Sequence, residues 1–421
     1  MDLRELVLDT LLETEEGKIY SHMALRNLLD KHAELDKQKR AFLTREIEGT
    51  LERRYTIDAM IDQYSKHPVK KMKPVIRNIM RIAVYELFFM DSIPAAVAIN
   101  EAVNLTERRG FYNLKPFVNG VLRTIERNRS EFDFTDPTML YSMPKWIVKL
   151  LEEEHGAEAM EEILQASLLA PPMTIRLNYC KGEENELLGH IRREAVEIRP
   201  ADFPGAYYIS NIDRLQALVT FREGFFHMMD LSSQMAMDRV ETKPGMKILD
   251  ACAAPGGKSM FFYSKLRGDV QITACDLTEN KTAMLWENFR RMGATAIRVR
   301  AQDALIFAPE LEKAFDLVVA DLPCSGLGVM SRKVDLKYRM TKEQIAELAD
   351  LQHRMLENLK RYVAPGGQLI YSTCTITHVE NEENTARFLA ESPEFSLVSE
   401  EQILPKPHIC DGFYYALLRR A

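Results

Sequence analysis

From about residue 240 to the C-terminus, short apolar runs alternate with helical stretches, and this alternation constrains the fold of the 421-residue chain more than any other feature. The runs read KILDAC, QITACDL, AIRVRAQDA, FDLVVADLP and GGQLIYSTC, and helical stretches such as ENKTAMLWENFRRMGA separate them. This is the pattern of a doubly wound, mostly parallel sheet. We therefore predict an α/β domain over residues 239–421. Binding sites in such sheets lie at the carboxyl ends of the strands, near the switch in strand order.

The chain before this domain divides into three regions. Residues 1–130 carry apolar side chains at helical spacing and have Pro94 and Pro116 at expected helix starts, so they predict an all-α domain. Residues 131–144 are rich in turn formers and predict a linker. Residues 145–238 combine a helical stretch broken at Gly156 with the strand PPMTIRLN, and predict a small α+β region.

The cysteines and the hydropathy pattern limit the classes of protein to be considered. No apolar run is long enough to span a bilayer, and the acidic, amphipathic N-terminus is unlike a secretory signal. The cysteines are scattered, without the spacing of a zinc site, and predict free thiols in a reducing compartment. We therefore expect a cytoplasmic protein with no membrane partner and no metal. The six cysteines are Cys180, Cys252, Cys275, Cys324, Cys374 and Cys410.

The charge of the chain is unevenly distributed. The net charge of −7 disfavours a nucleic-acid partner, yet 12 basic and only 5 acidic side chains lie between Lys37 and Arg81. Such a cluster is either a solvated helix face or a surface that binds phosphates. The basic residues expected to contact phosphates are Lys70, Lys71, Lys73, Arg77, Arg81 and Arg123.

A loop of small residues follows the first run of the α/β domain. Glycines allow a ligand to approach the backbone closely, and the following helix offers free N–H groups. The loop lacks the spacing of a dinucleotide or phosphate-binding motif, so by itself it is either a structural turn or a ligand loop. Its residues are Cys252, Ala253, Ala254, Pro255, Gly256, Gly257 and Lys258.

Two aspartates follow the next two runs. Asp276 is placed to bind the hydroxyls of a ribose, and Asp303 to accept from an exocyclic amine such as that of adenine. Each aspartate alone is equally consistent with a helix cap. Together with the loop they predict a site for a nucleoside without a pyrophosphate.

The fourth and fifth runs lead into ADLPCSGLG and YSTCT, which place Asp321, Cys324 and Cys374 at strand ends. A lone cysteine is usually a buried small hydrophobe, but two beside an aspartate suggest covalent chemistry. A thiolate that adds to C6 of cytosine makes C5 nucleophilic toward an electrophilic methyl group, and a carboxyl group assists at N3. The spacing does not say which cysteine attacks.

The motifs CAAPGGK, DLPCSGLG and YSTCT, in this order, resemble the NOL1/NOP2/Sun family of RNA cytosine-5 methyltransferases. The stretch IPAAVAINEAVNL…GFYNLKPFVNGVLR is similar to a NusB-like RNA-binding domain, which the bacterial branch acting on 16S ribosomal RNA carries at its N-terminus. PPMTIRLN resembles the motif that precedes the catalytic domain in that branch. The resemblance covers nearly the whole chain. It implies an all-α NusB-like domain, a small α+β region and a Rossmann-like methyltransferase domain.

The resemblance also implies a role for each candidate residue. Residues 252–258 would line S-adenosylmethionine, with Asp276 at the ribose and Asp303 at the adenine. Asp321 would contact the target cytosine and border the cofactor. Cys374 would attack C6, and Cys324 would assist release of the product. In the run after the second motif, Lys333, Asp335 and Tyr338 resemble a substrate-facing segment, and Arg332 and Lys333 would contact RNA.

The implied substrate is 16S ribosomal RNA at cytosine 967, modified by a monomeric enzyme. Other interpretations are a cytosine-5 methyltransferase for transfer RNA or another ribosomal position, and an inert RNA-binding assembly factor. A DNA cytosine methyltransferase is a further alternative, and it would use Cys324 as the nucleophile.

Overall fold

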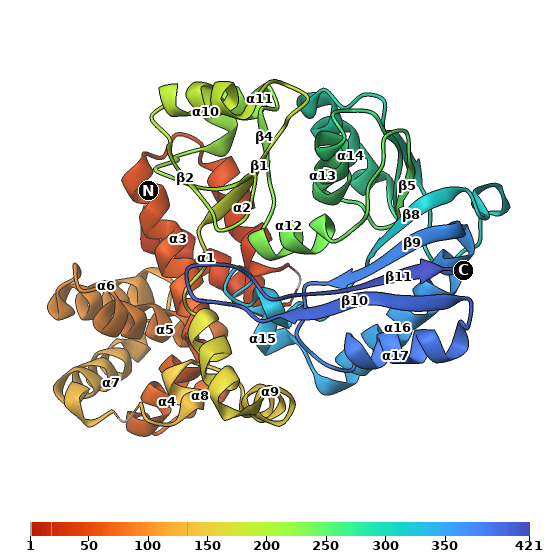
Figure 1. Cartoon of the computed structure of the whole chain (residues 1–421). Helices are drawn as coiled ribbons and strands as arrows, with labels where there is room; N and C mark the ends of the chain where they lie inside the picture. The colour runs from red at the N-terminus through yellow and green to blue at the C-terminus, as the bar shows by residue number, and fades with distance from the viewer. Residues whose placement is uncertain (1, 18, 133) are drawn as a thin grey trace. The chain divides into compact units, whose positions relative to one another are not determined.

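The computed structural model describes residues 2–17, 19–132 and 134–421, and these form two compact units (Figure 1). The first unit comprises residues 1–168 and 330–339, and the second comprises residues 169–329 and 340–421. The chain therefore leaves the second unit after Val329 and returns to it at Met340. Among the described residues, none of the helices combines the length and apolar character needed to cross a bilayer.

The first unit is all-helical, as predicted. Its core consists of apolar side chains that recur every three or four residues, such as Ile76, Ile79 and Ala83. Pro94 is the N-cap of one helix, and Pro116 lies in the first turn of the next. The helices are α1 (Leu3–Glu15), α2 (Ser21–Lys31), α3 (Lys37–Glu52), α4 (Arg54–Tyr64), α5 (Pro74–Phe89), α6 (Ala95–Arg108), α7 (Lys115–Arg127), α8 (Pro137–Leu140), α9 (Lys145–Ala166) and α15 (Leu336–Arg339).

Helix α9 is broken where the sequence predicted. Gly156 has φ 81° and ψ 166°, a backbone conformation that favours glycine, and it separates two helical segments. The sequence predicts α9 as part of the α+β region of residues 145–238, whereas the helix packs in the first unit.

Residues 330–339 follow the loop that carries Cys324, but they pack in the first unit. Asp335 is buried and accepts from the N–H of Ser21 at 3.1 Å and from its hydroxyl at 2.6 Å. The Tyr338 hydroxyl donates to Glu52 O at 3.0 Å and lies 3.0 Å from Ser142 Oγ. Asp335 and Tyr338 are thus occupied in the first unit, and the expectation that this run faces the substrate does not hold for them.

A small antiparallel sheet begins the second unit, in the order β2-β3-β1-β4. It confirms the predicted α+β region: the strand in PPMTIRLN is β1, and its partner β3 pairs Ile175 with Tyr207. The strands are β1 (Met173–Leu177), β2 (Glu197–Pro200), β3 (Ala206–Ser210) and β4 (Phe226–Met228), with α10 (Glu184–Arg193) and α11 (Val219–Arg222).

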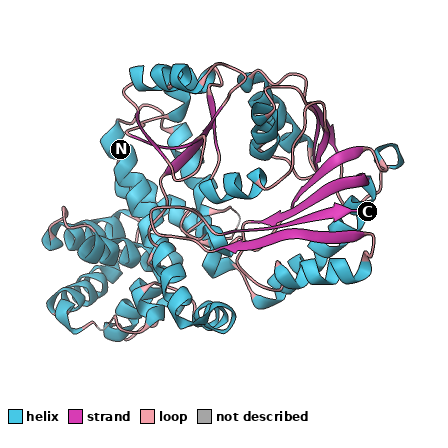
Figure 2. Cartoon of the chain, viewed as in Figure 1, coloured by secondary structure: helices cyan, strands magenta, loops and turns pink. Residues whose placement is uncertain are grey.

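The large sheet, seen in Figure 2, has the order β10-β11-β9-β8-β5-β6-β7. The five strands from β9 to β7 in this order are parallel to one another. All five predicted strands are present. The C-terminal β10 and β11 extend the sheet antiparallel to β9. The strands are β5 (Lys247–Asp250), β6 (Gln271–Asp276), β7 (Arg298–Ala301), β8 (Phe315–Asp321), β9 (Val363–Thr373), β10 (Phe395–Ile403) and β11 (Phe413–Arg420).

Consecutive strand residues point to opposite faces of this sheet and build two cores. Ile248 packs with side chains of α12 to α14, whereas Leu249 packs with those of α16 and α17. Strand order reverses between β5 and β8, so the switch point lies where Asp250 and Asp321 end their strands. The covering helices are α12 (Leu231–Asp238), α13 (Gly257–Lys265), α14 (Glu279–Met292), α16 (Lys342–Leu359) and α17 (Glu382–Glu391).

Candidate active site

The glycine-containing loop after β5 is held by hydrogen bonds from neighbouring strands. Asp276, at the end of β6, accepts from the N–H of Ala254 at 3.0 Å, and Ala253 donates to Cys275 O at 2.8 Å. Gly256 has φ 106°, and a Cβ there would lie 2.8 Å from the ring of Phe289. Only glycine fits this turn, which ends where α13 begins.

A cavity of about 230 Å³ lies at the switch point, bounded by this loop. Four carboxylates and one lysine face it together with small and apolar groups. Its lining comprises Met228, Met229, Asp230, Ser232, Ser233, Asp250, Cys252, Ala253, Ala254, Pro255, Gly257, Lys258, Asp321, Val329, Cys374, Asp411, Gly412 and Phe413.

The cavity is suited to a cationic nucleoside ligand. Asp250 is buried; its Oδ2 accepts from Ser259 at 2.7 Å, while its Oδ1 has no hydrogen-bond partner among the described residues. Burial raises the pKa of Asp250 to about 6. A cationic ligand would stabilise the ionised form. Opposite, a Cβ on Gly257 would have only Met228 O near it, at 3.8 Å, so the missing side chain leaves room for a ligand.

The two aspartates expected to bind the nucleoside lie at the ends of adjacent strands. Asp276 is buried, and its Oδ1 accepts from the N–H of Leu277 at 2.8 Å and pairs with Lys281 at 3.0 Å. Asp303 lies two residues beyond the end of β7, and its carboxylate accepts from the N–H of Leu305 at 2.8 Å. Both therefore also shape their own loops.

Lys258 and Asp321 form an ion pair at the cavity. The Lys258 ammonium donates to Asp321 Oδ2, and Ser372 donates to Oδ1 at 2.8 Å. Burial opposes the charge of Lys258, but the Asp321 carboxylate outweighs it and raises the pKa of the lysine. A fixed cation and carboxylate thus stand side by side, next to Cys374.

The two strand-end cysteines are brought together. Cys324 Sγ lies 3.3 Å from Cys374 Sγ. This hydrogen bond and burial raise the pKa of Cys324 well above its usual value. A Cys324 thiol that keeps its proton is able to donate it to the sulfur of Cys374, the cysteine that lines the cavity.

Several cavity residues were not found from the sequence. Asp250 lies within the run KILDAC and is the last residue of β5, so the strand-end rule would have found it once the strand's end was known. Asp230 precedes α12 and caps it, Asp411 lies in the loop before β11, and Phe413 is the first residue of β11. The latter two carry no motif, because they reach the cavity only through the antiparallel pairing of β11 with β9.

The basic residues expected to contact RNA divide into exposed and occupied ones. Lys70 and Lys71 are exposed on the turn before α5, and Lys73 is exposed at the N-cap of α5. Arg77 pairs with Glu15 at 2.8 Å. Arg81 differs from the expectation, because it is 6% exposed and its guanidinium binds both Asp58 and Glu15.

The remaining predicted contacts lie farther along the chain. Arg123 is exposed on α7, and its guanidinium lies 3.8 Å from Glu126. Arg332 is exposed and Lys333 half-buried, both in the segment that belongs to the first unit.

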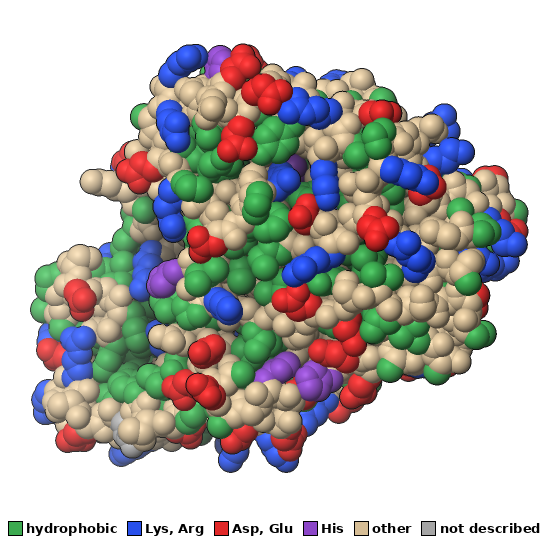
Figure 3. Space-filling view, in the orientation of Figure 1, with side chains coloured by type: hydrophobic (Ala, Val, Ile, Leu, Met, Phe, Trp, Pro, Cys, Tyr) green, Lys and Arg blue, Asp and Glu red, His purple; other side chains and the backbone are tan. Residues whose placement is uncertain are grey.

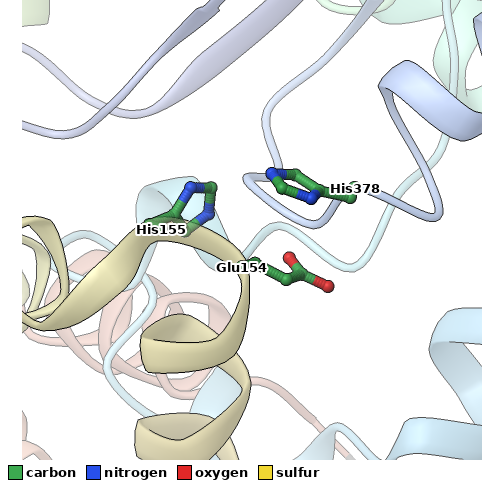
Figure 4. A group of neighbouring side chains, drawn as sticks. All are labelled: Glu154, His155 and His378. Atoms are coloured by element: carbon green, nitrogen blue, oxygen red, sulfur yellow. The ribbon is translucent and has the colours of Figure 1, made fainter.

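Among the described residues, two groups of histidine and acidic side chains have the donor types that a metal ion could bind. Figure 4 shows Glu154 and His155 on α9 and His378 in the loop after β9; these belong to different units, so no site is assigned to them. In the second group, ion pairs within the protein account for the side chains, at 3.0 Å from His353 to Glu391 and 2.6 Å from Lys360 to Glu357.

Comparison with known proteins assigns the three regions separately. Residues 237–419 match the family described as 16S rRNA methyltransferase RsmB/F. Residues 1–127 match the NusB family, and residues 143–210 match the ferredoxin-like domain of RsmF/B-like methyltransferases. The three matches follow the predicted fold classes along the chain.

Individual relatives extend over nearly the full length. The probable ribosomal RNA small subunit methyltransferase B of Bacillus subtilis (strain 168) is 33% identical over 421 residues, 97% of this chain and 94% of the relative. The solved structure of PH0851 covers 100% of this chain and 99% of its own, with a TM-score of 0.83 and 25% identity. NSun6 from Pyrococcus horikoshii with SFG shares the fold, with a TM-score of 0.59 and 20% identity over 67% of this chain and 99% of its own.

Fold and relatives together define a ribosomal RNA methyltransferase. More narrowly, the chain belongs to the RsmB/F family of 16S rRNA methyltransferases and carries a NusB-like N-terminal domain. The resemblance inferred from the three sequence motifs is thereby confirmed.

Proposed function

We propose that this protein methylates C5 of a cytosine in 16S ribosomal RNA, at cytosine 967, through a covalent bond between Cys374 and C6. The observation that carries the proposal is the meeting of two thiols, 3.3 Å apart, beside the Lys258–Asp321 ion pair at the cavity. Cytosine-5 chemistry requires a sulfur nucleophile and a group at N3, and this constellation supplies both.

The residues of the cofactor cavity would hold S-adenosylmethionine: residues 252–258 with backbone and small side chains, and Asp250 with its carboxylate. Asp276 and Asp303, which follow the next two strands and are not part of the cavity lining, would bind the nucleoside. The cofactor supplies an electrophilic methyl group attached to a sulfonium. The remaining chemistry belongs to side chains around Cys374.

Bond formation at the base begins with Cys374. Its thiolate adds to C6, and the Asp321 carboxyl group, as a donor of a proton or hydrogen bond to N3, stabilises the ring as electron density moves through it. C5, made nucleophilic in this way, would then accept the methyl group that bound S-adenosylmethionine supplies, with a neutral thioether as the leaving group. Transfer of the C5 proton to a solvent water molecule restores the C5–C6 double bond and expels the Cys374 thiolate. Cys324, 3.3 Å from that sulfur, assists this release.

The target base must leave its stack to reach these groups, so we infer that RNA is bound as a structure with a flipped nucleotide. Exposed Lys70, Lys71, Lys73 and Arg123 of the NusB-like domain, with Arg332 and Lys333, contact phosphates. Arg81 is not retained in this set, because its guanidinium is committed to Asp58 and Glu15. We further infer that the enzyme acts in the cytoplasm as a monomer.

Trapping on an RNA that carries 5-fluorocytosine tests the covalent step. Fluorine cannot leave C5 as a proton does, so the wild-type protein should form a stable adduct when S-adenosylmethionine is present. Cys374→Ala should form no adduct, and its methylation rate should fall at least about 1,000-fold. Cys324→Ala should still form the adduct but release product slowly.

The outcomes separate the alternatives. An adduct that depends on Cys324 instead of Cys374 would indicate the chemistry of DNA cytosine methyltransferases and contradict the proposal. Cofactor binding without any adduct would indicate an inert assembly factor. Bisulfite mapping of ribosomal and transfer RNA from cells with and without the gene identifies the target position.

A further inference from the structure

The segments on both sides of the two active-site cysteines are tied to one pair of consecutive residues. Pro323 and Ser325 flank Cys324, and Thr373 and Thr375 flank Cys374. The pair is Glu380 and Asn381, which precede α17 and are both fully buried. Neither residue lines the cofactor cavity.

Glu380 fixes the Cys324 loop. Its Oε1 accepts from the N–H of Ser325 at 2.8 Å and from Gln352 Nε2 at 3.0 Å. The same Gln352 nitrogen donates to Pro323 O at 3.0 Å. Both neighbours of Cys324 are therefore connected to this carboxylate, one directly and one through Gln352.

The second oxygen of Glu380 completes the set of donors. Oε2 accepts from the hydroxyls of Ser325 and of Thr377, the latter at 2.7 Å. A buried carboxylate is stable only when hydrogen bonds replace its hydration, and four donors do so here. The group is consequently rigid, since removing any donor leaves charge uncompensated.

Asn381 fixes the Cys374 loop in the same way. Its Oδ1 accepts from the Thr373 hydroxyl at 2.6 Å, and its Nδ2 donates to Thr375 O at 3.2 Å and to Gln402 Oε1 at 2.6 Å. The two loops are also joined directly, because Ser325 Oγ lies 2.7 Å from Thr375 Oγ1.

We propose that Glu380 and Asn381 are positioning residues for the methyl transfer: Glu380 holds the segment around Cys324, Asn381 holds the segment around Cys374, and together they set the separation of the two sulfurs. The proposal rests on the covalent mechanism above. Attack and release both need sulfur within bonding reach of one base, and a displacement of about 1 Å costs on the order of 100-fold in rate.

Near-isosteric variants test the proposal. Glu380→Gln removes the charge and turns one acceptor into a donor that faces Ser325 or Gln352. Asn381→Asp removes the donor to Thr375 O. The matched control is Glu383→Gln, the same change at an exposed position of α17. Thr377→Val removes one donor to Glu380, and Thr377→Ser should restore it.

The first measurement is the rate at which the two thiols form a disulfide, which depends on the separation of the sulfurs and not on methylation. The full-length protein is exposed to oxidised glutathione, and the Cys324–Cys374 disulfide is quantified by mass spectrometry; each closure yields two molecules of reduced glutathione. The disulfide should form rapidly in wild-type protein and in Glu383→Gln. It should form about 10-fold more slowly in Glu380→Gln and Asn381→Asp, and at an intermediate rate in Thr377→Val.

The second measurement is steady-state methylation. We expect kcat to fall about 100-fold in Glu380→Gln and Asn381→Asp, with the KM for S-adenosylmethionine within about twofold of wild type. Wild-type closure rates in these variants would overturn the proposal. So would a fall in kcat that merely parallels lost cofactor affinity or thermal stability, including in the milder Thr377→Val. If wild-type protein forms no adduct with 5-fluorocytosine RNA, the covalent mechanism is wrong. The rates of disulfide formation still test whether Glu380 and Asn381 position the two sulfurs.

Discussion

At the scale of single residues, charge at the cofactor cavity is set by burial. Asp250 is 1% exposed, one of its carboxylate oxygens has no hydrogen-bond partner within the described part of the chain, and burial raises its pKa from 3.8 to about 6. Without cofactor, the folded protein therefore holds a proton that the unfolded chain has released between these values. The contribution of this group to stability is complete below about pH 4 and is lost as the pH rises through 6.

Asp250→Asn should remove this pH dependence. Without cofactor, the free energy of unfolding of wild-type protein should fall relative to the variant by about 3 kcal/mol between pH 4 and 7, since one pKa unit corresponds to about 1.4 kcal/mol. Urea unfolding at several pH values measures the difference. Asp269→Asn, at an exposed position, should track the wild type. A constant difference between wild type and Asp250→Asn would contradict the shift.

At the scale of elements, three loops from different parts of the sheet meet behind the nucleophile. Gly328 donates from its N–H to Cys374 O at 3.1 Å, and Gly412 donates to Gly328 O at 2.8 Å. A Cβ on Gly328 would lie 2.6 Å from Gly412 O and 2.7 Å from Cys374 O. Because the contacting atoms belong to the backbone, no side-chain rotation can relieve such a clash.

Gly328→Ala should therefore displace the Cys374 loop. We expect kcat to fall about 100-fold, with adduct formation on 5-fluorocytosine RNA slowed to the same extent. Gly120→Ala on α7 is the control, because a Cβ there meets nothing within 4 Å and alanine favours a helix. Normal adduct kinetics in Gly328→Ala would show that the loop tolerates the shift.

At the scale of the whole molecule, RNA binding has to overcome a net charge of −7. Acidic and basic side chains are interspersed over the face seen in Figure 3. Binding must then depend on local clusters, of which Lys70, Lys71 and Lys73 are the exposed members near α5. A local cluster gives a salt dependence that counts its phosphate contacts.

Reversing two of these charges tests the surface. Lys70→Glu/Lys71→Glu should weaken RNA binding at least about 10-fold and lower the slope of log K against log salt by about 2. Lys145→Glu/Lys149→Glu makes the same charge change at exposed positions of α9 and should leave the slope near that of wild type. Equal effects in the two variants would exclude a specific role for the Lys70–Lys73 cluster.

Hydrophobic periodicity and strand-end position are local properties of a sequence. They were enough to predict the order of domains, the five parallel strands, and Asp321, Cys324 and Cys374 as strand-end candidates. The partners of each group, in contrast, depend on how distant parts of the chain pack together. Arg81 lies in a basic stretch of sequence but is neutralised by Glu15 and Asp58 from other helices. Glu380 and Asn381 look like helix-flanking polar residues until pairing of distant strands places them behind both thiols, because hydrogen-bond partners are chosen in space and not along the chain.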